Sequence, residues 1–123
     1  MREIKFRAKR TDNGEWIIGD LHLHTPFPHI HSTRGDKAKI DTNTIGQFTG
    51  FRDCDEKEIF EGDIVKFMAH DGLGNELGNQ QGIIRYLYGG YLIGGYDMYD
   101  ILLNDDEAEI IGNIHDNPEL LKR

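Results

Sequence analysis

Four of the six histidines lie in one short stretch, at His22, His24, His29 and His31. Alternate residues of a strand share a face, so the first two could present imidazoles to one metal ion, with the second two as another pair. Pro26 and Pro28 interrupt the stretch, however, and proline favours an irregular or edge segment. A His-x-His pattern is also common without metal. We therefore predict solvated loop histidines and no metal site.

Glu61 and Asp63 flank Gly62 and could form a carboxylate pair for acid–base chemistry. Nothing in the adjacent sequence supplies the burial or charge that would shift a carboxyl pKa. Aspartate beside glycine commonly bonds to its own backbone in a turn. We predict a turn here. No Ser-His-Asp, Cys-His or lysine nucleophile arrangement is recognisable, so we expect no catalytic residue and a function other than that of an enzyme.

Residues 69–82 are rich in glycine, asparagine and glutamine. A phosphate-binding loop requires Lys followed by Ser or Thr after its last glycine, whereas Gly78 is followed by Asn79 and Gln80. The acidic positions and glycine placement of a calcium loop are also missing. We expect a mobile loop or a long hairpin connection that binds no cofactor.

Five tyrosines could form a platform for stacking nucleic-acid bases. They are Tyr86, Tyr88, Tyr91, Tyr96 and Tyr99. Such platforms lie in positively charged grooves, and only Arg85 is nearby. The sequence therefore favours core and edge positions for the tyrosines.

The acidity of the chain is concentrated in its C-terminal half. The formal net charge is −8. Residues 1–66 hold 11 Lys and Arg against 12 Asp and Glu, and residues 67–123 hold 3 against 10. Such a field repels a phosphate backbone, so we expect nucleic-acid binding to be disfavoured. The alternative is a basic site on the first strand, made of Arg2, Lys5, Arg7, Lys9 and Arg10.

Strands with apolar and polar alternation are expected to position these residues. Residues 3–8 form the first strand, Asp12-Asn13-Gly14 the turn, and residues 16–23 the returning strand. Residues 32–44 are polar and are predicted to be a connection. Alternation resumes from Ile45 to Phe51, five turn-favouring residues follow from Asp53 to Lys57, and the chain returns through residues 59–67.

The C-terminal third is predicted to be a β-meander. Its segments IIRYLY, YLI and YDMYDILL are separated by the glycine pairs at 89–90 and 94–95. An acidic turn over residues 104–108 leads to a last strand over residues 109–114. Asn117 then has the character of a helix cap and Pro118 that of a first helical residue, which predicts a short terminal helix.

Several stretches resemble the YopX-like family of phage and prophage proteins. They are REIKFRA, IGQFTGF, EIFEGDIVKF and IGNIHDNPELL, and they reach from one end of the chain to the other. The resemblance implies an all-β fold, a phage context and no assigned activity, so it carries over no catalytic residue. Where such proteins commonly have an Asn-Gly-type turn, this chain has Cys54-Asp55-Glu56-Lys57, which predicts a different hairpin connection.

The length and composition predict one all-β domain over residues 1–123, a small barrel-like or SH3-like arrangement of antiparallel hairpins with a short C-terminal helix. No apolar run is long enough for a membrane span or a secretory signal, so we expect a cytoplasmic protein of the bacterial host. Cys54 is the only cysteine, which excludes an internal disulfide. We expect an accessory protein that acts by contact with a protein partner, and leave homo-oligomerisation open.

Overall fold

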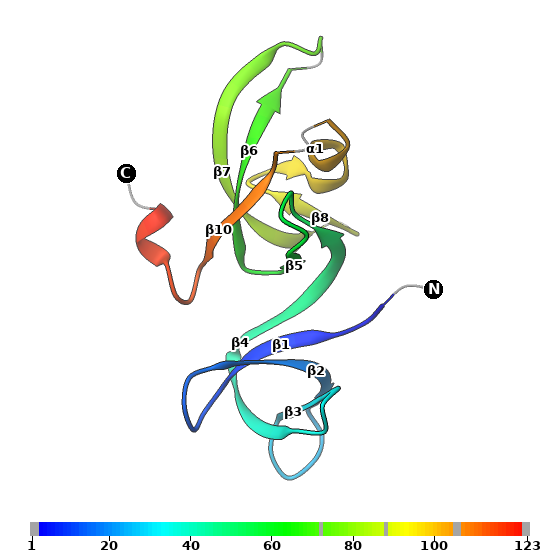
Figure 1. The fold of residues 1–123 in the computed structure, drawn as a ribbon, viewed down its shortest axis with the longest axis vertical. Helices are drawn as coiled ribbons and strands as arrows, with labels where there is room; N and C mark the ends of the chain where they lie inside the picture. Colours follow the sequence, from blue (N-terminus) through cyan, green and yellow to red (C-terminus); the bar gives the residue numbers. More distant parts are fainter. Residues whose placement is uncertain (1–2, 72, 88, 105–106, 122–123) are drawn as a thin grey trace. The chain divides into compact units, whose positions relative to one another are not determined.

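The computed structural model describes residues 3–71, 73–87, 89–104 and 107–121. Nearly all regular structure in these residues is antiparallel β-sheet, which confirms the all-β prediction (Figure 1). The chain divides into two compact units, residues 1–50 and residues 51–123. That these residues form one domain stays a prediction.

The first unit is a ring of four strands. These are β1 (Phe6–Arg10), β2 (Trp16–His22), β3 (His29–Ser32) and β4 (Lys37–Arg52), the last of which continues past the unit boundary. Each pairs antiparallel with the next, and β1 also pairs with β4. The first hairpin confirms the prediction, with Gly14 at a φ of 73° in its turn. This closure is the barrel-like feature that the sequence predicted.

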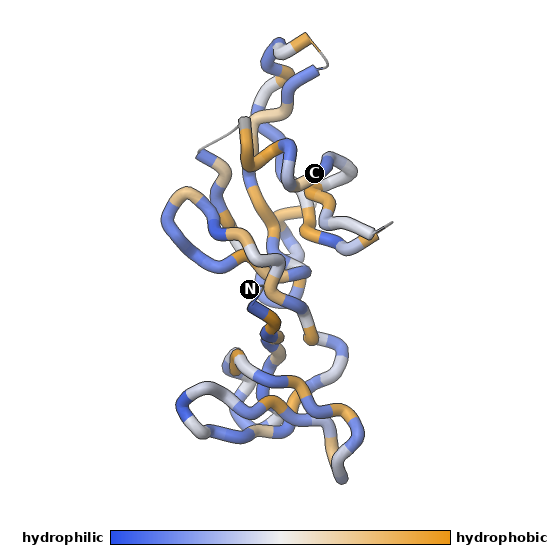
Figure 2. Tube along the Cα trace, turned by 90° about the vertical axis from the view of Figure 1, so that its right-hand side faces the viewer, coloured by the Kyte–Doolittle hydropathy of each residue, from blue (hydrophilic) through white to orange (hydrophobic). Residues whose placement is uncertain are grey.

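One face of each strand in the ring is apolar, and Figure 2 shows the corresponding alternation of hydrophobic and hydrophilic residues. The buried residues are Ala8, Ile17, Ile30, Ala38 and Ile40, with Phe6, Leu21 and Ile45 packed against them. Burying an isoleucine side chain contributes about 1.5–3 kcal/mol, so this small cluster is the main stabilising feature of the ring.

The prediction of a connection over residues 32–44 is wrong from Lys37 onward, because β4 begins there. Ala38 and Ile40 are buried and alternate with exposed charged residues. They face the core once β3 pairs with this segment, with Ile30 directly opposite Ala38. Short apolar side chains between charges gave too weak a signal for the strand to be recognised.

The hairpin after β4 uses the unusual turn that the sequence predicted. The N–H of Asp53 donates to the carbonyl of Lys57 at 2.9 Å, and β5 (Glu58–Phe60) follows. Glu56 has a φ of 63°, the only positive value at a described residue other than glycine. Glu56 thus takes the left-handed position that glycine or asparagine usually holds.

The second unit contains an open five-stranded sheet in the order β10-β6-β7-β8-β9. Its strands are β6 (Asp63–His70), β7 (Glu76–Leu87), β8 (Gly90–Ile93), β9 (Tyr96–Asp97) and β10 (Glu109–Asn113). The helix α1 (Met98–Asn104) lies on the sheet and buries Met98 and Ile101 in its core. The chain then forms a 3-10 helix, η1 (Pro118–Leu121).

Residues 69–82 belong mostly to the long β6–β7 hairpin, which agrees with the second of the two predicted alternatives and not with a mobile loop. The prediction of an extended segment over YDMYDILL is wrong. Residues 98–104 form α1 rather than a strand, because residues 98 and 101, three apart, both reach the core. The acidic turn predicted over residues 104–108 includes residues 105 and 106, which lie outside the described part of the chain.

The short C-terminal helix is confirmed, and it begins at Pro118 as predicted. The side chain of Asn117 turns back, and its Oδ1 accepts a hydrogen bond from the N–H of Asn113 at 3.3 Å. Asn117 therefore joins η1 to the end of β10.

Candidate interaction surface

The histidine stretch is an ordered hairpin of β2 and β3. His22 lies directly opposite His29, and their rings stack at a centroid distance of 4.8 Å and an angle of 10°. His29 is 6% exposed, and its Nδ1 lies 3.0 Å from Thr25 Oγ1. The prediction of a solvated histidine is wrong for His29, while His22, His24 and His31 are exposed. Burial of His29 follows from strand pairing that the two prolines obscured.

Of the basic residues predicted for a nucleic-acid site, Lys5, Arg7 and Lys9 lie against aromatic rings rather than on an open, solvated face, and Arg2 lies outside the described residues. Arg7 and Lys9 lie 4.5 and 5.5 Å from the ring centroid of Trp16, and Lys5 lies 4.8 Å from that of Phe48. Lys5 also forms an ion pair with Glu3. Cation–π contacts of this kind contribute about 0.5–2 kcal/mol each, and they cover the ring surface that a base would need for stacking. The arrangement weakens the case for a nucleic-acid site here.

The predicted turn at Gly62 is observed, with Gly62 at a φ of 91°. Asp63 is 2% exposed, and its Oδ2 accepts a hydrogen bond from the N–H of Phe60 at 2.8 Å. The N–H of Gly62 donates to the carbonyl of Ile84, which ties the turn to β7. Asp63 thus has the backbone-bonding role that its sequence position suggested.

Among the described residues, one group of three side chains has metal-ligand atoms within 4.8 Å of one another: Cys54, Asp55 and Glu109. All three are exposed. Partial desolvation and the charges of the neighbouring carboxylates raise the pKa of the Cys54 thiol, which disfavours the thiolate that binds metal. The group therefore lacks the properties of a prepared site.

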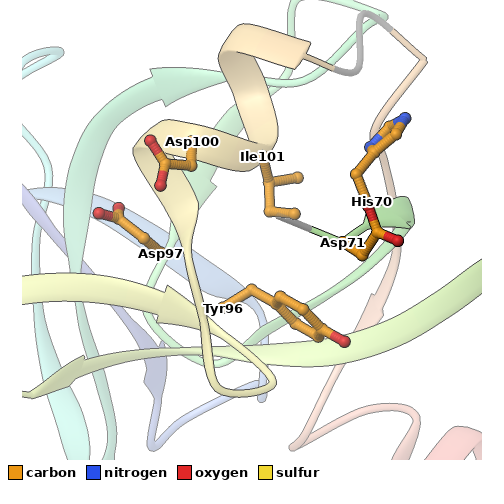
Figure 3. Close-up of a pocket in the computed structure, with 6 residues that line it drawn as sticks. All are labelled: His70, Asp71, Tyr96, Asp97, Asp100 and Ile101. Carbon is orange, nitrogen blue, oxygen red and sulfur yellow. The ribbon is translucent and has the colours of Figure 1, made fainter. Parts of the chain in front are cut away.

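An acidic pocket of about 340 Å³ lies between α1 and the β6–β7 hairpin. Its lining consists of His70, Asp71, Tyr96, Asp97, Asp100 and Ile101. Figure 3 shows Asp97 and Asp100 on one side, with His70 and Asp71 on the other, and Ile101 between them. Asp71 already accepts hydrogen bonds from the N–H groups of Leu73 and Asn75, which lower its carboxyl pKa. The carboxylates do not converge on one point.

The four tyrosines that the structure describes do not form one platform. Tyr91 is buried and packs edge to face with the exposed Tyr86, at a centroid distance of 5.0 Å. Tyr96 packs on Phe67 and Tyr99 on Phe51. Tyr88 lies outside the described residues. The observed positions agree with the core-and-edge interpretation.

The outer face of β7 and β8, which sequence reasoning missed, carries an apolar surface in the second unit. A depression of about 300 Å³ lies there, lined largely by apolar atoms. We call its side chains Ile83, Arg85, Leu87, Leu92 and Leu121 the contact face. Leu87 and Leu121 are 46% and 41% exposed. The two-residue period of a strand could have indicated this face, because Ile84 is buried in the core and its neighbours in the sequence point to the other side of the sheet.

The two units differ strongly in net charge. Residues 1–50 contain 8 Lys and Arg against 6 Asp and Glu, a formal net charge of +2. Residues 51–123 contain 6 against 16, a net charge of −10. The contact face therefore belongs to a strongly acidic unit.

These features define a small all-β protein with an apolar depression on the sheet of its acidic unit. Residues 5–122 match the family described as YopX protein, so the chain belongs to the YopX protein family. The crystal structure of protein EF1440 from Enterococcus faecalis is similar over 99% of this chain and 100% of that one, with 27% sequence identity and a TM-score of 0.60. No curated protein matches significantly.

Proposed function

We propose that this chain is a phage or prophage accessory protein that acts in the bacterial cytoplasm by binding a protein partner through the contact face. Membership of the YopX protein family supports the phage context. None of the described helices is long and apolar enough to cross a membrane. The observation that carries the proposal is the apolar depression on the outer face of β7 and β8.

Exposed apolar groups gathered on one sheet face are typical of interaction sites rather than of free surface. Leu87, Leu92 and Leu121 line one depression although they come from three different elements. Covering such side chains removes apolar area from water, at about 25 cal/mol per Å². The contact face would thus supply the binding energy.

The partner is expected to be basic around this apolar centre. With a net charge of −10, residues 51–123 attract positively charged surfaces and accelerate their association. A nucleic-acid enzyme of the phage or host presents such a surface. Direct nucleic-acid binding through β1 remains the alternative, but the cation–π contacts of Lys5, Arg7 and Lys9 and the acidic second unit weaken it.

The test is affinity capture from a host lysate followed by mass spectrometry, with Leu87→Asp as the decisive variant. Leu73→Asp is the matched control, because Leu73 is also an exposed leucine but lies at the tip of the β6–β7 hairpin, outside the contact face. We expect the wild-type protein and Leu73→Asp to retain the same partner, and Leu87→Asp to lose it with an unchanged melting temperature. Equal capture by all three proteins would refute the proposal.

A further inference from the structure

Arg85 differs from most cations of this chain in its surroundings. It is exposed on the outer face of β7, directly opposite Leu92 of β8. Its side chain forms no hydrogen bond or ion pair with any residue that the structure describes. By contrast, Arg10 pairs with Asp12, and Arg52 pairs with Glu58. Within the described part of the chain, the Arg85 guanidinium therefore has no side-chain partner.

The side chains around Arg85 make this guanidinium a recognition element. Ile83, Leu87, Leu92 and Leu121 line the same depression, and Arg85 is the only charged residue among the described residues that line it. A ligand that covers these apolar groups also displaces water from the guanidinium, which strengthens any charged hydrogen bond that it forms. Guanidinium groups bind carboxylates through two parallel hydrogen bonds.

Building on the proposed protein-binding function, we infer that the contact face recognises a partner segment in which an aliphatic side chain lies next to a carboxylate. The aliphatic side chain enters the depression beside Leu92, and an aspartate or glutamate of the same segment binds Arg85. The two partner groups must be neighbours, because Arg85 and Leu92 are paired across adjacent strands.

The charge at the contact face is opposite in sign to that of its unit. Residues 51–123 carry a net charge of −10, yet the one charged group among the described residues that line the depression, Arg85, is positive. Long-range attraction and local recognition therefore select different features of the partner. The partner is a basic surface with one acidic residue beside an aliphatic one, and that acidic residue fixes its position.

The experiment uses two capped hexapeptides that contain lysine and leucine and differ at one position, glutamate in one and glutamine in the other. Each is titrated into the ¹⁵N-labelled full chain and followed by NMR. The acidic unit alone would favour the glutamine peptide, because it is the more positive. We expect the glutamate peptide to bind about tenfold more tightly, as a charged hydrogen bond implies. Shifts should centre on Arg85, Leu87 and Leu92.

Variants of Arg85 identify the source of this preference. Arg85→Gln should abolish it, and Arg85→Lys should keep part of it, because the charge remains but the bidentate geometry is lost. Lys66→Gln is the control, since Lys66 is also an exposed cation of this sheet and does not line the depression. It should leave the ratio of the two affinities unchanged.

Equal affinity for the two peptides, or shifts located away from β7 and β8, would overturn the inference. Tighter binding of free hexanoate than of the glutamate peptide would also overturn it, by making the site one for small carboxylates. These failures are distinct from failure of the proposed function. Loss of partner capture in Leu87→Asp with no peptide preference would leave protein binding in place and remove only the role of Arg85.

Discussion

The carboxylate of Asp53 accepts a hydrogen bond from the backbone N–H of Ile110, with an Oδ2–N distance of 3.0 Å across 57 residues of sequence. Its Oδ1 accepts two more, from the N–H groups of Asp55 and Lys57, each at 2.9 Å. Asp53 is 5% exposed. One buried side chain thus holds both the turn before β5 and the start of β10.

Asp53→Ala should lower the free energy of unfolding by about 2–4 kcal/mol, because it leaves several backbone N–H groups without their acceptor. Chemical denaturation monitored by circular dichroism measures this change. Asp55→Ala, two residues further along the same turn and exposed, is the control and should change stability by less than about 0.5 kcal/mol. Equal effects of the two substitutions would show that the Asp53 bonds are not important.

Gly82→Ala should destabilise the sheet, whereas Gly90→Ala should not. A Cβ at Gly82 would lie 2.6 Å from the backbone N of Gly94, whereas one at Gly90 meets nothing within 4 Å. We expect a loss of about 1–3 kcal/mol for Gly82→Ala. Gly90→Ala should be neutral or slightly stabilising, because it restricts the unfolded chain. Thermal melting of both variants checks the contrast, and a stable Gly82→Ala protein would contradict the close approach.

Protonation of Asp71 should loosen the tip of the β6–β7 hairpin. Hydrogen bonds from Asn75 and Leu73 hold the pKa of Asp71 below its ordinary value of 3.8. A lowered folded-state pKa means that the stabilisation is present above pH 3.8 and is lost as the pH falls through the folded-state value. NMR titration of the Asp71 carboxyl carbon should therefore give a midpoint below 3.8. A midpoint at or above that value would contradict the turn geometry.

Sequence patterns were sufficient for the parts of the fold in which local signals and tertiary pairing agree. The Asn-Gly turn before β2, the turn at Gly62 and the start of η1 at Pro118 were all predicted. In each, one glycine or proline needs a particular backbone conformation, so the residue type alone indicates the structure.

The remaining parts depend on pairing that no local pattern reports. β7 includes a polar, glycine-containing segment that becomes a strand because β6 pairs along it, with Phe67 opposite Gln80. His29 is buried because β3 pairs with β2, which places His29 opposite His22 with their rings stacked. The contact face was missed for a related reason, since Leu121 joins Leu92 only when η1 folds back on the sheet.

The basic residues of β1 should not bind nucleic acid. Each neutralised phosphate would contribute a slope of about 0.7–0.9 in log K against log salt, so genuine binding would depend steeply on salt. We expect no anisotropy change above background with labelled single- or double-stranded oligonucleotides, at low or physiological salt. Micromolar binding at physiological salt that disappears when Lys5, Arg7 and Lys9 are replaced by Gln would make nucleic-acid binding, and not protein binding, the favoured function.

The central claim is that the outer face of β7 and β8 binds a protein, and photo-crosslinking in the bacterial host tests it most directly. A photoreactive amino acid replaces Leu87 in the contact face or, as the control, Lys57, which is exposed in the turn before β5. We predict a discrete protein adduct from position 87 and none from position 57. No adduct from position 87, the same adducts from both positions, or adducts with nucleic acid alone would contradict the claim.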